Sequence, residues 1–129
     1  IYKLEIPTET DATDIMYMFK KRLFSDYLEI VIPVEIRLTH FKTQTVFQYQ
    51  TYTKYSLPLD YLESTTILSP TDVIFFNELA FVSINHARAL TTLKTINTEF
   101  FQMIPAFFSL DNILTLTEKI IINQKFQDY

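Results

Sequence analysis

Cysteine, glycine and tryptophan are all absent from this chain of 129 residues. Without cysteine the chain has no disulfide bond, no catalytic thiol and no zinc site built on thiolates. Average usage would give roughly nine glycines in a chain of this length. Phosphate-binding loops, dinucleotide turns and nucleophile elbows need glycine where the backbone approaches a ligand or takes positive φ, so their usual forms are excluded.

Charge is modest, and long apolar runs are missing. The formal net charge is −4 and charged residues make up 20% of the chain, which gives no basic surface for a phosphate backbone. We interpret the one cluster of cations, Lys20, Lys21 and Arg22, as a solvated face. No run approaches the roughly 18 to 20 apolar residues of a spanning helix. The sequence therefore predicts neither a membrane partner nor strong direct nucleic-acid binding.

Aromatic residues are abundant, with twelve phenylalanines and eight tyrosines. A chain of this length predicts one domain or a domain with a small appendage, and small domains bury a limited share of their surface. Some of these rings are therefore expected to stay partly uncovered, as anchors of a protein interface are. The alternative is that they all fill the core of the domain itself.

The first half of the chain predicts a small β-rich unit with one helix over residues 1–62. A short strand ends at Pro7, and residues 10–29 have helix-start acids with Ile15, Phe19, Leu23 and Tyr27 close to one stripe. Residues 29–38 are rich in β-branched side chains. Because Pro33 cannot donate to a ladder, they predict an edge strand or two short strands. Residues 43–57 alternate and predict a further strand.

The second half predicts a helical domain over residues 63–129, which makes the fold class α+β with a helical bundle after the β-rich unit. One helix is expected over residues 70–90, with Ser69 as N-cap and Pro70 at its first position. A second is expected from about Thr92, and a third from Ser109. The core stripe of the first helix is Val73, Phe76, Ala80 and Ile84 or Ala87; that of the second is Leu93, Ile96, Phe100, Met103 and Phe107.

Adjacent phenylalanines in the second of these helices point to two buried faces. Phe100 and Phe101 would lie about 100° apart around a helix axis. We expect Phe100 to face the core and Phe101 to face a partner protein. The predicted partner interface consists of Phe75, Phe101, Ile104, Phe107 and Phe108.

Catalytic chemistry has little support in the sequence. His40 and His86 lie far apart, and the neighbouring acids Asp11 and Asp14 are typical of helix caps. Serine and threonine are common but have no nearby base. We therefore expect no catalytic residue, no cofactor and no metal ligand, so that the chain is not an enzyme.

Three short motifs, in this order, resemble the Psf three-type subunit of the GINS complex, a replication factor of four subunits. The matching residues are Leu57, Pro58 and Leu59, then Leu68, Pro70 and Asp72, then Leu93, Ile96, Phe100 and Phe101. The resemblance implies a short β domain before a helical domain, whose helices pack on sister subunits of a heterotetramer. It also implies a non-catalytic, nuclear protein that braces the replicative Mcm helicase during DNA replication.

Two other readings stay open. One is an unrelated small α+β adaptor, such as a viral or kinetochore-associated interaction module, that also works through its aromatic surface. The other is a minor enzyme or ligand-binding domain with an aromatic-lined pocket. Without the resemblance, the sequence predicts only an intracellular location.

Overall fold

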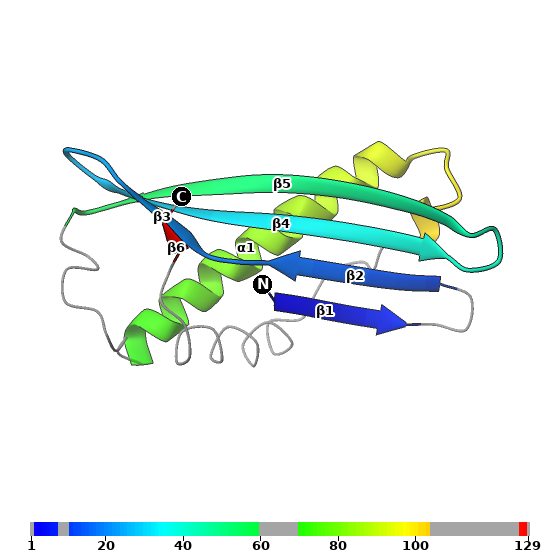
Figure 1. The fold of residues 1–129 in the computed structure, drawn as a ribbon, viewed down its shortest axis with the longest axis horizontal. Coiled ribbons are helices and arrows are strands. Elements are labelled where there is room, and N and C mark those ends of the chain that lie inside the picture. The colour runs from blue at the N-terminus through cyan, green and yellow to red at the C-terminus, as the bar shows by residue number, and fades with distance from the viewer. Residues whose placement is uncertain (1, 8–10, 60–69, 104–126, 129) are drawn as a thin grey trace.

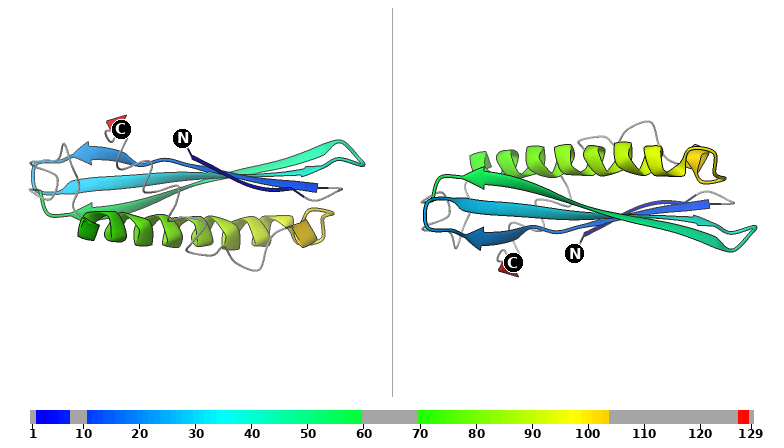
Figure 2. Two further views of the ribbon diagram at one scale, coloured as in Figure 1. Left: turned by 90° about the horizontal axis from the view of Figure 1, so that it is seen from below. Right: turned by 90° about the horizontal axis from the view of Figure 1, so that it is seen from above.

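A computed structural model describes residues 2–7, 11–59, 70–103 and 127–128 (Figure 1). Within these residues one long helix, α1, lies across one face of an antiparallel sheet (Figure 2). The strands are β1 (Tyr2–Pro7), β2 (Asp11–Tyr17), β3 (Lys20–Leu23), β4 (Leu28–His40), β5 (Thr45–Leu57) and β6 (Gln127–Asp128). The helices are α1 (Pro70–Thr95) and the 3-10 turn η1 (Phe101–Met103).

The sheet is a meander in which each long strand pairs with the next along the chain. β1 pairs with β2, β2 and β3 both pair with β4, and β4 pairs with β5, all antiparallel, while β6 adds a short parallel pairing to β3. β2 and β3 continue a single register, since Tyr17 lies opposite Val34 and Lys20 lies opposite Val31. β4 is therefore a central strand with a neighbour on each side.

The predicted edge strand at Pro33 is wrong, and the reason is local. Pro33 lies opposite the gap between β2 and β3, where the Met18 N–H donates to the Pro33 carbonyl at 3.4 Å. Proline has no N–H to return the bond. The missing donor thus interrupts the neighbouring strand for two residues and leaves β4 continuous.

The helix predicted over residues 10–29 is also wrong, because this segment forms β2, β3 and the turn that follows. Thr13, Ile15, Tyr17 and Phe19 alternate toward the core and are each at most 4% exposed. Residues four apart share a face in a helix and also in a strand, so the stripe from Ile15 to Phe19 fits both. The stripe ends at Leu23, which is 70% exposed, and Tyr27 instead stacks on Phe24 in the turn, with ring centroids 4.6 Å apart.

Alternation along β4 and β5 forms the sheet side of the core. The buried residues of β4 on this face are Leu28, Ile30, Ile32, Val34, Ile36 and Leu38. On β5 the predicted alternation is confirmed: Phe47 and Tyr55 pack against the core, and the residues between them alternate with exposed ones.

The helix side of the core is the predicted stripe of α1. The helix begins at Pro70, as predicted, and Phe76, Ala80, Ile84 and Ala87 are almost fully buried. The ring of Phe76 meets that of Phe19 edge-on, with centroids 5.7 Å apart. Val73 was also predicted in this stripe, but its side chain is not among those that the structure describes.

The second predicted helix is wrong, because α1 runs on to Thr95 and the chain then turns. Asn97 takes a left-handed conformation at φ 66°, the usual device for ending a helix. Leu93 and Ile96, expected in the core, are 64% and 48% exposed. Thr91 and Thr95 take the inward places, and their hydroxyls donate to the carbonyls of Ala87 and Thr91.

The α+β class is confirmed, whereas no helical bundle is seen among the described residues, where α1 is the one long helix. The predicted third helix and Phe107 lie outside those residues. Described residues on both sides of the predicted boundary at residue 62 contribute to one core cluster.

Candidate protein-interaction surface

The side of α1 that faces away from the sheet carries large apolar side chains. Ile74, Val82 and Leu93 are 58%, 53% and 64% exposed. At 3.6 residues per turn they fall within about 100° of the circumference, opposite the buried stripe. The exposed Glu78, His86 and Ala89 lie between them. We call Ile74, Val82 and Leu93 the outer α1 face.

Apolar side chains on both sides of a helix are typical of a helix covered on both sides. In the described part of the structure, α1 forms an outer layer, with the sheet on one side of it (Figure 2). The sheet seals the stripe from Phe76 to Ala87 and leaves the outer α1 face exposed. The outer α1 face is therefore a candidate docking surface.

The turn after α1 separates the two adjacent phenylalanines. Phe100 is 9% exposed, and its ring centroid lies 5.8 Å from that of Phe47 on β5. Phe101 is 45% exposed at the start of η1. Thr98 fixes this turn, since its hydroxyl donates to the Thr95 carbonyl at 2.6 Å and accepts from the Phe100 N–H at 3.2 Å. Phe100 therefore faces the core, as expected, and Phe101 is exposed. A turn, rather than a helix, sets their directions.

The other residues of the predicted interface are placed only in part. Phe75 is half-buried, and its ring lies 5.5 Å from that of Phe76. Ile104, Phe107 and Phe108 lie outside the described residues. Ile74 and Val82 were not predicted as interface residues, and Leu93 was predicted in the core. Their spacing of eight and eleven residues, opposite a stripe already assigned to the core, is the signal that could have found them.

The residues of the three motifs that resemble the GINS subunit lie in different parts of the described structure. Leu57 ends β5, Pro58 and Leu59 follow it, and Pro70 opens α1. Asp72 lies in the first turn of α1, outside the described side chains, and Leu68 lies outside the described residues. Leu93 lies in the last turn of the same helix and Ile96 directly follows its end, so the last motif does not open a helix of its own.

A buried polar contact fixes how α1 lies on β5. The Tyr55 hydroxyl donates to the Leu79 carbonyl at 3.2 Å and lies 2.8 Å from Ser83 Oγ, which donates to the same carbonyl at 2.7 Å. Burial raises the pKa of the Tyr55 hydroxyl above its ordinary value of 10.0, and the hydrogen bond with Ser83 partly offsets the rise. Ser83 is fully buried and so is closed to a substrate.

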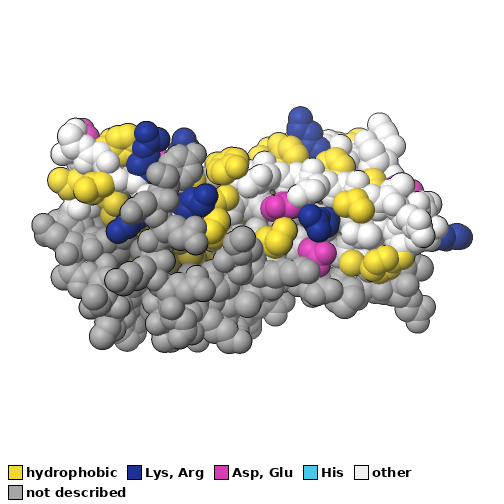
Figure 3. All heavy atoms as spheres, in the orientation of Figure 1, with side chains coloured by type: hydrophobic (Ala, Val, Ile, Leu, Met, Phe, Trp, Pro, Cys, Tyr) yellow, Lys and Arg dark blue, Asp and Glu magenta, His cyan; other side chains and the backbone are white. Residues whose placement is uncertain are grey.

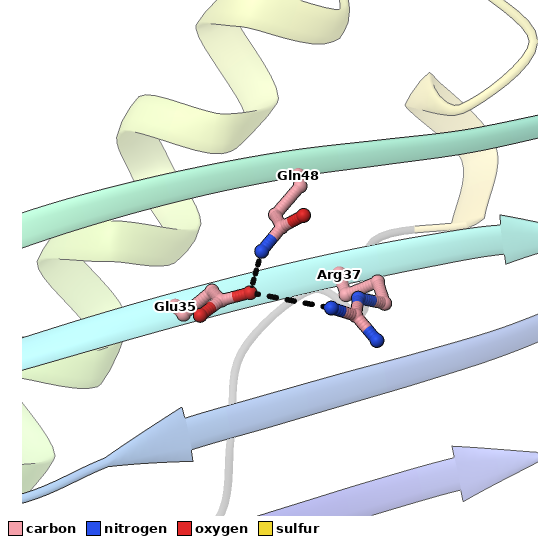
Figure 4. A network of polar contacts seen from close by, with 3 residues as sticks. All are labelled: Glu35, Arg37 and Gln48. Carbon is pink, nitrogen blue, oxygen red and sulfur yellow. Dashed lines mark hydrogen bonds and ion pairs between the residues drawn. The ribbon is translucent and has the colours of Figure 1, made fainter.

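The opposite face of the sheet is mixed in character (Figure 3). Glu35 Oε1 lies 3.8 Å from Arg37 Nη2 and accepts a hydrogen bond from the Gln48 amide, as Figure 4 shows. The cation beside this carboxylate makes it an ordinary surface ion pair. A hollow of about 120 Å³ next to it is lined by Met16, Tyr17, Met18, Pro33, Glu35 and Gln50.

Neither histidine of the described structure lies in a group suited to metal binding. Nδ1 of His40 accepts from the Thr43 N–H at 3.3 Å, and Nδ1 of His86 lies 3.5 Å from the Thr53 hydroxyl. No group of three or more histidine, aspartate or glutamate side chains that could hold a metal ion occurs among the described residues. In that same part of the chain, no helix has the length and apolar character needed to cross a membrane.

Comparisons of the chain with protein-family models, with curated proteins and with solved structures gave no match. In its described residues the chain is a four-strand meander, extended by the short β3 and β6 segments, with one long helix that carries exposed apolar side chains on its outer side.

Proposed function

We propose that this chain is a non-catalytic interaction subunit that binds another protein through the outer α1 face, with Ile96 and Phe101 extending the contact. One observation carries the proposal. Ile74, Val82 and Leu93 are each more than half exposed on a helix whose opposite side is sealed against the sheet. Exposed apolar side chains aligned along one side of a helix suit a partner that covers that side.

The energetic reason lies in the hydrophobic effect. Fully burying an exposed valine, leucine or isoleucine contributes about 1.5–3 kcal/mol. Ile74, Val82 and Leu93 have only the exposed part of their surface left to bury, so together they supply a smaller but still useful contribution to the free energy of association. The partner that fits is an apolar groove or a second amphipathic helix, because a helix surface packs its ridges into such grooves.

The hollow described on the sheet's mixed face gives little support to a small-molecule ligand. Pockets for drug-sized ligands usually enclose about 300–1,000 Å³. The hollow beside Pro33 and Glu35 measures about 120 Å³. It is therefore too small to favour the ligand-binding alternative.

For the identity of the partner, we propose the other subunits of a GINS-like complex, in the nucleus, where the assembly braces the Mcm helicase. The support is the order of the three motifs, with Leu57 ending a strand, Pro58 and Leu59 following it, and Pro70 opening a helix. The competing identity is an unrelated adaptor, which needs the same exposed helix but different partners.

Co-expression separates the two identities. The chain is produced with the three other GINS subunits, and a stable complex with one copy of each supports the finer proposal. A chain that ignores those subunits, yet is recovered from its own cells in a complex that Val82→Asp disrupts, supports the adaptor. Leu23→Asp is the matched control, because Leu23 is also an exposed apolar residue but lies on β3.

A further inference from the structure

β5 is a long strand that, among the described residues, is paired on one side only. It runs for 13 residues and pairs with β4 over its full length, and no described strand pairs with its other side. In Figure 1 it forms the outer border of the sheet. An edge of this length offers a row of backbone donors and acceptors to another strand.

The pairing around Pro33 shows which backbone groups point outward. The Pro33 carbonyl accepts from Met18, so it points away from β5. In an antiparallel ladder the N–H and C=O of a residue point the same way, and the direction alternates along the strand. Tyr52, which lies opposite Pro33, therefore turns its own N–H and C=O away from β4. By the same alternation so do Val46, Gln48, Gln50, Lys54 and Ser56.

The usual protections of an edge strand are nearly absent from β5. Natural edges are blunted by charges, prolines, bulges or short length. β5 contains a single charged residue, Lys54, contains no proline, and keeps an unbroken register with β4. Val46 and Tyr52 add exposed apolar side chains to this edge, at 55% and 52% exposure.

We propose that β5 pairs antiparallel with β5 of a second copy of this chain, so that the two sheets become one. This surface is separate from the outer α1 face and does not depend on the proposed function.

Three features favour a second copy as the occupant. The outward edge of β5 can pair with itself. Each outward residue offers a backbone N–H donor and a backbone C=O acceptor, and the copy presents the same row of groups in the opposite direction. Lys54 lies near one end, so a two-fold axis near the middle of β5 brings no like charges together. The exposed side chains of Val46 and Tyr52, on the other face of β5, give the two copies apolar side chains that can contact each other across the pairing.

Because the chain has no cysteine, a cysteine scan tests the proposal directly. Single cysteines are placed at Val46, Gln48, Gln50, Tyr52 and Lys54 of the full chain, alone and in pairwise mixtures of a tagged and an untagged variant. In an antiparallel pair the numbers of two residues that lie opposite each other have a fixed sum. After oxidation, disulfide-linked dimers are therefore expected only for pairs of positions, one in each copy, whose residue numbers add to that sum. β4 and β5 show this antiparallel signature within one chain, where Leu28 faces Leu57 and His40 faces Thr45.

Two further variants measure the strength of the association. Gln50→Pro removes an N–H that the β4 ladder does not use, and is expected to raise the dimer dissociation constant at least about tenfold. Gln50→Thr keeps the N–H and is expected to leave the constant unchanged. Sedimentation across a concentration series gives the constants, and far-ultraviolet circular dichroism checks the fold of both variants.

Three outcomes would overturn the proposal. The first is a wild-type chain that sediments as a monomer at every concentration. The second is disulfide linkage with no constant sum. The third is a dimer linked through cysteines at Val82 or Leu93 and not through β5, which would assign self-association to the outer α1 face instead.

Discussion

At the scale of single residues, Phe100 and Phe101 show how neighbouring side chains take opposite roles. Phe100 closes the core against Phe47, whereas Phe101 is 45% exposed next to the end of α1. Their opposite directions could be predicted from the sequence, because adjacent residues diverge in helices, strands and most turns. The turn itself could not, since Asn97 is a weaker signal for positive φ than glycine and the chain has no glycine.

Phe100→Asp is expected to destabilise the fold by about 3–5 kcal/mol, because it removes a packed ring and buries a charge. Phe101→Asp is expected to stay within about 1 kcal/mol of the wild type but to weaken partner binding. Thermal unfolding and co-purification measure the two effects. Equal losses of stability and binding in both variants would contradict the assignment.

Tyr55 gives the fold a dependence on alkaline pH. Because the pKa of its hydroxyl is raised in the folded state, the unfolded chain ionises first as the pH rises above 10.0. The contribution of Tyr55 to the free energy of unfolding is therefore complete below pH 10.0 and is lost as the pH rises through the folded-state pKa. Tyr55→Phe is expected to flatten this part of the curve of stability against pH. A variant with the same alkaline slope as the wild type would show that other tyrosines cause it.

At the scale of elements, α1 was the most predictable part of the fold and the strand pair before β4 the least. The start of α1 has a proline at its first position, and its inward stripe repeats every three to four residues. In β2 and β3, by contrast, Ile15 and Phe19 stand four residues apart, which suits either period, and the acids of β2 imitate a helix start. Only pairing with β4, a tertiary effect, decides the matter.

The two sides of α1 are expected to respond differently to the loss of side-chain volume. Ile84→Ala opens a cavity under the helix and is expected to cost about 2–5 kcal/mol. Val82→Ala removes exposed atoms and is expected to change the free energy of unfolding by at most about 0.5 kcal/mol. Urea unfolding of the isolated chain measures both. A large cost for Val82→Ala would mean that this chain itself covers the outer α1 face.

At the scale of the whole molecule, the described sheet and helix share one hydrophobic core rather than two. The sheet and α1 were predicted to belong to separate units divided at residue 62, because strand patterns dominate before that residue and helix patterns after it. The burial of their side chains shows that the sheet and α1 depend on each other, because the apolar face of β4 packs directly under α1. Leu93 was misplaced because a second helix with a core stripe of its own was predicted from about Thr92, whereas α1 continues to Thr95 and leaves Leu93 exposed.

A fragment of residues 1–62 is expected not to fold alone. Without α1, the six core side chains of β4 from Leu28 to Leu38 would face water on a sheet with no cover. Nuclear magnetic resonance of the fragment, with the full chain as control, tests this. A dispersed spectrum typical of a folded sheet would support two independent units instead.

The most direct test of the central claim is the labelling rate of a thiol on the outer α1 face. Val82→Cys and Leu23→Cys each introduce the only cysteine of the chain, at exposed apolar positions on α1 and β3. Maleimide labelling is compared between the isolated chain and the complex recovered from its own cells. We predict that the complex slows labelling at position 82 at least about tenfold, as burial under a partner would, and leaves position 23 unchanged. Equal rates at position 82 in both samples would contradict the claim that α1 is the docking element.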